Sequence, residues 1–105
     1  MGRSNSEKIM SIQEGYRYYK EGDYQKAAEI CEKILDTDEN NPKVWNLLGI
    51  CLTKLEQYDL ADTCYQNSLV LDPDNKAYQK NIIINEKKTG QYSHYSFESN
   101  QSPGS

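Results

Sequence analysis

The chain has 105 residues, a formal net charge of −4 and a hydrophobic fraction of 36%. This length fits one small domain or two to three short repeats, and the acidic balance argues against nucleic-acid binding, which needs clustered Lys and Arg. No apolar run approaches the ~20 residues of a membrane-spanning helix, so no membrane span is expected.

The three cysteines are odd in number and lack C-x-x-C spacing. They are interpreted as reduced thiols of a cytosolic or nuclear protein, and a cytoplasmic location is expected. Cys31 and Cys64 are expected in the core and Cys51 partly so, since buried cysteine usually behaves as a small hydrophobe. The lone His94 adds too few ligands for zinc, and no metal or cofactor is expected.

The chain is predicted to begin with a flexible N-terminus, residues 1–7, which is polar and resembles no signal peptide. Its first six residues, M-G-R-S-N-S, match the short and common pattern for myristoylation of Gly2, and an engineered or accidental match is the favoured interpretation.

The first predicted unit, residues 8–41, contains two helices. Gly22 is interpreted as a helix-ending glycine, and Asp23 as the N-cap of the next helix. Because Ser11 and Glu14 are polar, we expect the outer side of the first helix to be uncovered.

The second predicted unit, residues 42–75, begins with Asn41 as N-cap and Pro42 in the first helical position. Apolar residues then recur at helical spacing, and Trp45 among them is expected to be largely buried between the hairpins. The following helix has a predicted buried face made of Leu60, Ala61, Cys64, Tyr65, Ser68 and Leu69. Pro73 ends this helix.

A capping helix over residues 76–89 is predicted to cover the second unit. From residue 90 to residue 105 the chain is rich in Ser, Gly, Asn and Gln and has no apolar period. This composition predicts a disordered tail.

The two units repeat each other at one fixed interval, which is the interval from Gly15 to Gly49. The other identical pairs at this interval are Lys20 and Lys54, Tyr24 and Tyr58, Ala27 and Ala61, Leu35 and Leu69, Asp38 and Asp72, and Asn41 and Asn75. Small residues among these pairs indicate places where two helices approach closely.

The second unit resembles the tetratricopeptide repeat, whose pattern has the same period. The matching residues are Trp45, Leu48, Gly49, Leu52, Ala61, Tyr65 and Pro73, and the first unit departs at Ser11, Glu14 and Cys31. The resemblance implies an all-α fold of antiparallel helix hairpins, with two repeats and a capping helix forming a short right-handed superhelix. The alternative is an unrelated pair of helical hairpins.

The resemblance also implies a protein–protein interaction module, an adaptor or scaffold, that binds a peptide along the first helix of each hairpin. The corresponding positions are Ile12, Tyr16, Tyr19, Lys20, Asn46, Leu47, Ile50, Lys54, Lys80, Asn81 and Ile84. With their inward neighbours Lys43, Lys87 and Lys88 they include six lysines and no acid. This predicts a basic groove with an apolar floor, suited to a peptide with acidic flanks. The alternative is that these lysines only keep the protein soluble.

Some tetratricopeptide domains grip the terminal carboxylate of chaperone tails. The matching positions here are Ile12, Tyr16, Leu47, Ala77 and Asn81, and four of these five cannot form a polar clamp. Chaperone-tail recognition is therefore not expected.

Self-assembly is the alternative function. Because helical repeats usually need about three units for stability, exposed ends could pair with another copy and give a weak homo-oligomer. An enzyme is not expected, because the sequence lacks the hydrolase, phosphate-loop and metalloprotease motifs and its single histidine lies in the predicted tail.

Overall fold

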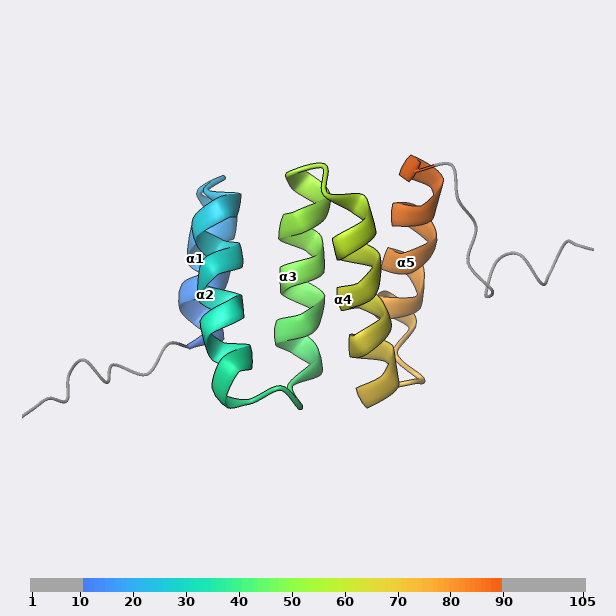
Figure 1. The fold of residues 1–105 in the computed structure, drawn as a ribbon, viewed down its shortest axis with the longest axis horizontal. Coiled ribbons are helices and arrows are strands. Elements are labelled where there is room, and N and C mark those ends of the chain that lie inside the picture. The colour runs from blue at the N-terminus through green and yellow to red at the C-terminus, as the bar shows by residue number, and fades with distance from the viewer. Residues whose placement is uncertain (1–10, 90–105) are drawn as a thin grey trace, which may run out of the picture.

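The structure is a computed structural model that describes residues 11–89. The predicted flexible N-terminus, the Gly2 motif and the predicted tail with His94 lie outside the described residues. The described part contains five helices and no strand: α1 Ile12–Lys20, α2 Tyr24–Thr37, α3 Pro42–Lys54, α4 Tyr58–Leu71 and α5 Lys76–Thr89 (Figure 1).

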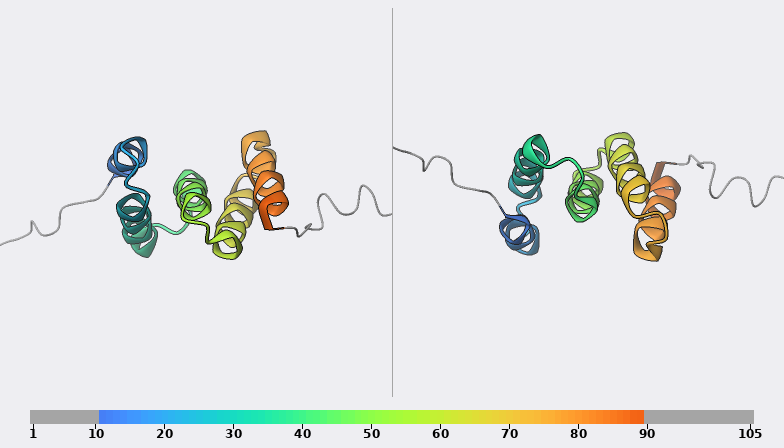
Figure 2. Two further views of the ribbon diagram at one scale, coloured as in Figure 1. Left: turned by 90° about the horizontal axis from the view of Figure 1, so that it is seen from above. Right: turned by 90° about the horizontal axis from the view of Figure 1, so that it is seen from below.

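Successive helices run antiparallel and pack as neighbours, so α1 with α2 and α3 with α4 form two hairpins, and α5 packs against α4. Seen from the end, α1 and α5 lie on one side, α2 and α4 on the other, and α3 lies between (Figure 2). We call the exposed side of α1, α3 and α5 the inner face, and that of α2 and α4 the outer face. The predicted all-α array of two hairpins and a capping helix is confirmed.

The first helix of each hairpin has a glycine where a neighbouring side chain approaches its backbone closely. A Cβ placed on Gly49 would lie 2.6 Å from Cε1 of Tyr65, so the ring packs directly on the backbone of α3. In the first hairpin Cys31 stands at the position of that tyrosine, and the space is filled from α3. A Cβ on Gly15 would lie 3.1 Å from Cδ2 of Leu47 and 3.7 Å from Sγ of Cys31.

The two hairpin turns have the same geometry. Gly22 has φ 86°, and Glu56, at the equivalent position of the second unit, has φ 65°. In each turn the next amide closes back on the preceding helix, with Asp23 N donating to Tyr18 O at 2.9 Å and Gln57 N donating to Leu52 O at 2.8 Å. This satisfies carbonyls left free at the helix end and confirms the helix-ending role of Gly22.

Side chains cap the N-termini of α2 and α5. Asp23 Oδ1 accepts from Lys26 N at 3.1 Å, as predicted. Asn75 Oδ1 caps α5, accepting from Tyr78 N at 3.1 Å. Asn41 occupies the N-cap of α3, but its side chain makes no capping bond, so the prediction is right only in position.

Three burial predictions were wrong. Trp45 is only half-buried, because its Nε1–H donates to the carbonyl of Glu39 at 2.8 Å and holds the ring beside the α2–α3 loop. Leu60 is 57% exposed instead of buried. Cys51 is completely buried instead of partly so.

All three cysteines are free thiols in the core, and burial raises the pKa of each to about 12. These thiols therefore stay protonated at neutral pH and are poor nucleophiles.

Candidate functional site

A row of apolar side chains crosses the inner face at the repeat interval. Tyr16 on α1, Ile50 on α3 and Ile84 on α5 occupy the same position in successive units. Tyr16 is 37% exposed, Ile84 is 44% exposed and Ile50 is half-buried. Partial burial raises the pKa of the Tyr16 phenol, so it remains a neutral hydrogen-bond donor. We call these three residues the apolar row.

A row of lysines lies one helical turn further along the same helices. Lys20, Lys54 and Lys88 are again separated by the repeat interval, and all three are exposed. Each lies in the last turn of its helix, where a positive charge interacts favourably with the helix dipole. Lys54 Nζ lies 6.0 Å from the centroid of the Tyr24 ring. We call these three residues the lysine row.

Two predicted site residues bond to each other. Asn81 Nδ2 on α5 donates to Asn46 Oδ1 on α3 at 2.8 Å, which joins the inner sides of the two helices. This bond orients both amides and leaves part of their hydrogen-bonding capacity for a partner.

The remaining predicted site residues divide between surface and core. Lys80 is exposed, whereas Ile12 and Tyr19 are half-buried and pack against the core. The Tyr19 ring is 5.7 Å from that of Tyr24 between centroids. Leu47 departs from the prediction because it is completely buried beside Gly15, so it cannot contact a partner.

Sequence reasoning missed a buried polar chain behind the inner face. Thr53 Oγ1 donates to Asn85 Oδ1 at 2.9 Å and lies 3.0 Å from the Tyr65 hydroxyl. Asn85, which is 1% exposed, also donates from Nδ2 to the Tyr58 carbonyl at 2.9 Å. These bonds join α3, α4 and α5, and the single asparagine after three isoleucines was the available signal.

A second missed feature is a pair of acids between α4 and α5. Glu86 is only 4% exposed, and it interacts with Asp62. The pKa of Asp62 is raised, first by burial and then by the negative charge of Glu86, with a bond from Gln66 acting in the opposite direction.

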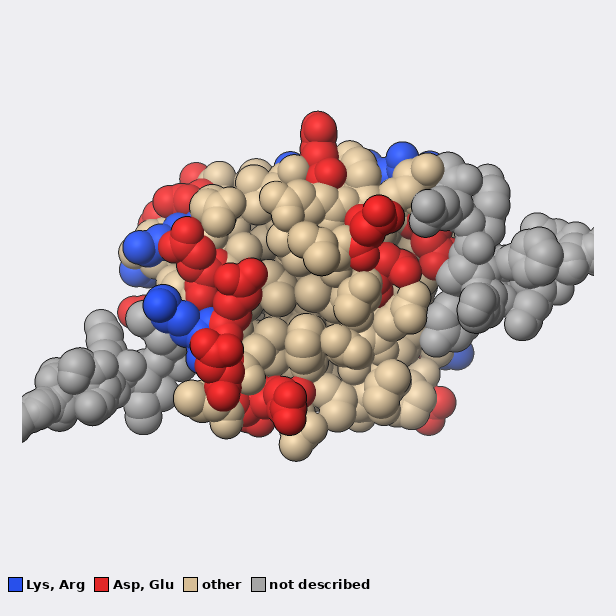
Figure 3. All heavy atoms as spheres, viewed as in Figure 1, with Lys and Arg blue, Asp and Glu red and all other residues tan. Residues whose placement is uncertain are grey.

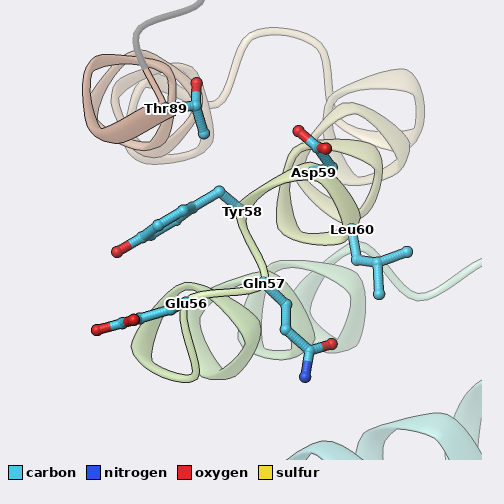
Figure 4. A pocket seen from close by; sticks show the side chains of 6 residues that line it. All are labelled: Glu56, Gln57, Tyr58, Asp59, Leu60 and Thr89. Atoms are coloured by element: carbon cyan, nitrogen blue, oxygen red, sulfur yellow. The ribbon is translucent and has the colours of Figure 1, made fainter.

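A hollow of about 450 Å³ lies where the ends of α3 and α5 meet the start of α4. Its lining residues are Glu56, Gln57, Tyr58, Asp59, Leu60 and Thr89 (Figure 4). Glu56 and Tyr58 extend to one side, whereas Gln57 and Leu60 extend to the other. Because these side chains diverge, the hollow presents no set of groups aimed at one reacting atom.

Within residues 11–89, no three metal-ligating side chains lie together. Over the same residues, no helix is long and apolar enough to cross a membrane.

Comparison with known proteins identifies the repeat. The tetratricopeptide repeat family model matches residues 18–81. Tetratricopeptide repeat protein 12 of Mus musculus is 32% identical over 80 residues, covering 76% of this chain. TPR repeat-containing protein MJ1428 of Methanocaldococcus jannaschii is 37% identical over 87 residues, covering 77% of it.

The chain spans only 11% and 15% of the lengths of these two relatives. Among solved structures, MamA D159K mutant 2 matches with a TM-score of 0.69 and 23% identity, over 73% of this chain and 42% of that one. This structural likeness supports the fold.

Proposed function

Since the chain belongs to the tetratricopeptide repeat family, whose domains generally mediate protein–protein interactions, we propose that it is an adaptor that binds a segment of a partner protein across its inner face. The observation that carries this proposal is the parallel course of the apolar row and the lysine row, at one repeat interval, over α1, α3 and α5.

The spacing of the rows defines the kind of segment. Packed helices lie about 8–10 Å apart, a distance that an extended chain covers in about three residues. A partner crossing the three helices would therefore present apolar groups to the apolar row at intervals of about three residues. Acidic groups at the same interval would lie beside the lysine row. We propose an extended, acidic and apolar segment as the ligand.

The lysine row is tested with peptides selected from a random library on the immobilised chain. The variant is Lys54→Glu with Lys88→Glu, in which both positions are exposed. It should slow association of the selected acidic peptides, because exposed charges act mainly on the rate of encounter. Added salt should shrink the difference between variant and parent, since the Debye length is about 8 Å at physiological ionic strength. Association rates measured by surface plasmon resonance provide the check.

The apolar row is tested separately with Tyr16→Ala and Ile84→Ala combined. Loss of buried anchors should speed dissociation and leave association nearly unchanged. Both double variants must keep the parent's helical circular dichroism spectrum. If neither changes the binding of any selected peptide, the inner face is not the site.

Three finer expectations stay predictions: an acidic partner, a cytoplasmic location, and weak self-association through the ends of the array. Sedimentation of the chain at several concentrations tests the last of them.

A further inference from the structure

One strip of α4 on the outer face lacks charge where the repeat elsewhere carries it. Leu60, Thr63, Asn67 and Val70 recur at spacing that places them along one side of α4, and we call them the α4 strip. The equivalent residues of α2, one repeat interval earlier, are Lys26, Glu29, Lys33 and Asp36. The first hairpin thus presents four charges to solvent where the second presents none.

The α4 strip is largely exposed, and two of its members are apolar. Val70 is 77% exposed and Leu60 is 57% exposed, while the adjacent Leu71 is 36% exposed. Figure 3 views this side of the molecule, with acidic side chains gathered over α2, further acids where α4 begins, and an uncharged surface over α3 and the lower part of α4. Exposed apolar side chains that lie together, as Val70 and Leu71 do at the end of α4, are characteristic of interaction sites, whereas single exposed leucines are common.

The strip continues into a second hollow. This hollow of about 340 Å³ lies between the α2–α3 loop and the end of α4, and is lined by Glu39, Asn40, Trp45, Asn67, Val70 and Leu71. A half-buried tryptophan beside exposed aliphatic side chains is typical of the centre of a binding site.

The charges around this surface indicate its partner. From Leu55 to Asn75 the chain has no Lys or Arg, and its exposed acids are Glu56, Asp59 and Asp74. Glu39 adds a further acid at the hollow itself. A partner with apolar anchors and basic flanks is therefore complementary, whereas an acidic one would be repelled.

We propose that the α4 strip and this hollow form a docking site for an amphipathic helix that carries leucine-like anchors flanked by lysine or arginine. From Leu60 to Val70 the strip rises about 15 Å along α4, which is close to three turns of a partner helix with anchors at i, i+3, i+4, i+7 and i+11. The site is on the opposite side from the inner face and does not depend on the function proposed there.

The probe is a synthetic peptide of about 18 residues, made of leucine and lysine with leucines at that spacing, and it is compared with a scrambled peptide of the same composition. Trp45 is the only tryptophan of the chain and lines the hollow, so its fluorescence reports docking directly. The helical peptide should shift Trp45 emission and bind about tenfold or more tightly than the scrambled one. Salt should weaken this binding because of the acidic surroundings.

Two matched variants locate the binding. Leu60→Ser combined with Val70→Ser should lower the affinity for the helical peptide about tenfold or more, because it removes both exposed apolar side chains of the strip. Tyr16→Ser with Ile84→Ser makes the same kind of change at exposed positions of the inner face and should leave the affinity within about twofold.

Four results would overturn the proposal. Both peptides could bind equally, or the α4-strip variant could bind as the parent does. Sedimentation could show self-association that Leu60→Ser with Val70→Ser abolishes, which would assign the strip to a second copy. Nuclear Overhauser contacts between the strip and residues 90–105 in the chain alone would assign it to the protein's own C-terminal segment.

Discussion

Glu56 adopts a backbone conformation that the first hairpin gives to a glycine. Its φ is 65°, and the equivalent Gly22 has φ 86°. An L-residue in this left-handed region has its Cβ too close to the following carbonyl, at a cost of roughly 1–2 kcal/mol. Glu56 is exposed, and within residues 11–89 its side chain makes no hydrogen bond or ion pair that would offset this cost. The second turn is therefore strained where the first is relaxed.

Glu56→Gly should stabilise the protein by about 0.5–1 kcal/mol, somewhat less than the strain itself because glycine also loosens the unfolded chain. Urea unfolding followed by circular dichroism measures the change. Gly22→Ala is the matched control and should destabilise, since it introduces the same strain into the first turn. If both substitutions lower the urea midpoint of unfolding, the backbone conformation of Glu56 does not cost the protein stability.

Asp62 gives the stability a pH dependence of definite sign. Its pKa is raised by burial and by the charge of Glu86, so the folded protein holds this proton more tightly than the unfolded chain does. The resulting stabilisation is complete below the unfolded pKa of about 3.9 and is lost as the pH rises through the folded pKa. Above the folded pKa, Asp62 carries its charge close to another acid, which opposes folding.

Asp62→Asn should therefore raise the melting temperature at pH 7, and its advantage over the parent should shrink as the pH falls toward 4. Thermal melts across this range provide the measurement. Asp74→Asn is the control. Asp74 is exposed just before the start of α5, where a negative charge is favourable, and it is not among the charges that act on Asp62, so its removal should bring no gain. An advantage of Asp62→Asn that is independent of pH would contradict the explanation.

Between elements, the two hairpins use their glycines differently, and this predicts different responses to the same substitution. Gly49→Ala should destabilise by roughly 1–3 kcal/mol, because the new Cβ would meet the Tyr65 ring at 2.6 Å and 2.7 Å. In Gly15→Ala the one tight contact of the new Cβ is with the end of the flexible Leu47 side chain at 3.1 Å, and the contacts with Cys31 and Ile30 at 3.7 Å and 3.8 Å are ordinary packing distances. Since alanine is the better helix former by ~1 kcal/mol, Gly15→Ala should be nearly neutral. Equal effects on the denaturation midpoint would contradict this packing.

The same contacts show why the hairpins could be predicted and the exact inner face could not. Gly15 and Gly49 recur because two helices must approach closely there, which is visible in one sequence. Leu47 lies on a helix that is packed from two sides, by α2 and by α4, so helical spacing alone could not separate it from the more exposed Ile50.

Polar contacts between helices that are distant in the sequence were harder still to predict from the sequence. Thr53 and Asn85 lie far apart in the sequence and bond only because α5 lies against the second hairpin. Trp45 matches the repeat pattern, yet its bond to the loop carbonyl of Glu39 keeps it half-exposed. Both depend on the relative placement of packed helices, which periodicity does not determine.

At the scale of the molecule, neighbouring helices are in contact, whereas the helices at the two ends of the array are not. Each helix packs on the next along the chain, α3 contacts both α1 and α5, and α2 and α5 stand apart (Figure 1). Stability in such arrays is approximately a sum of unit terms and nearest-neighbour terms. The effects of substitutions at opposite ends on the free energy of unfolding should therefore be additive, whereas the effects of two substitutions in the same interface should not.

Double-mutant cycles test this directly. Ile34→Val in α2 and Ile82→Val in α5 each remove one buried methyl group, at a cost of about 0.5–1.5 kcal/mol, and should add within about 0.5 kcal/mol. Thr53→Val and Asn85→Leu break the same buried hydrogen bond, so the second change should cost less once the first has been made. Their coupling should reach about 0.5–3 kcal/mol. Urea unfolding of the single and double variants and the parent gives both cycles, and strong coupling between Ile34 and Ile82 would show that the whole array folds as one inseparable core.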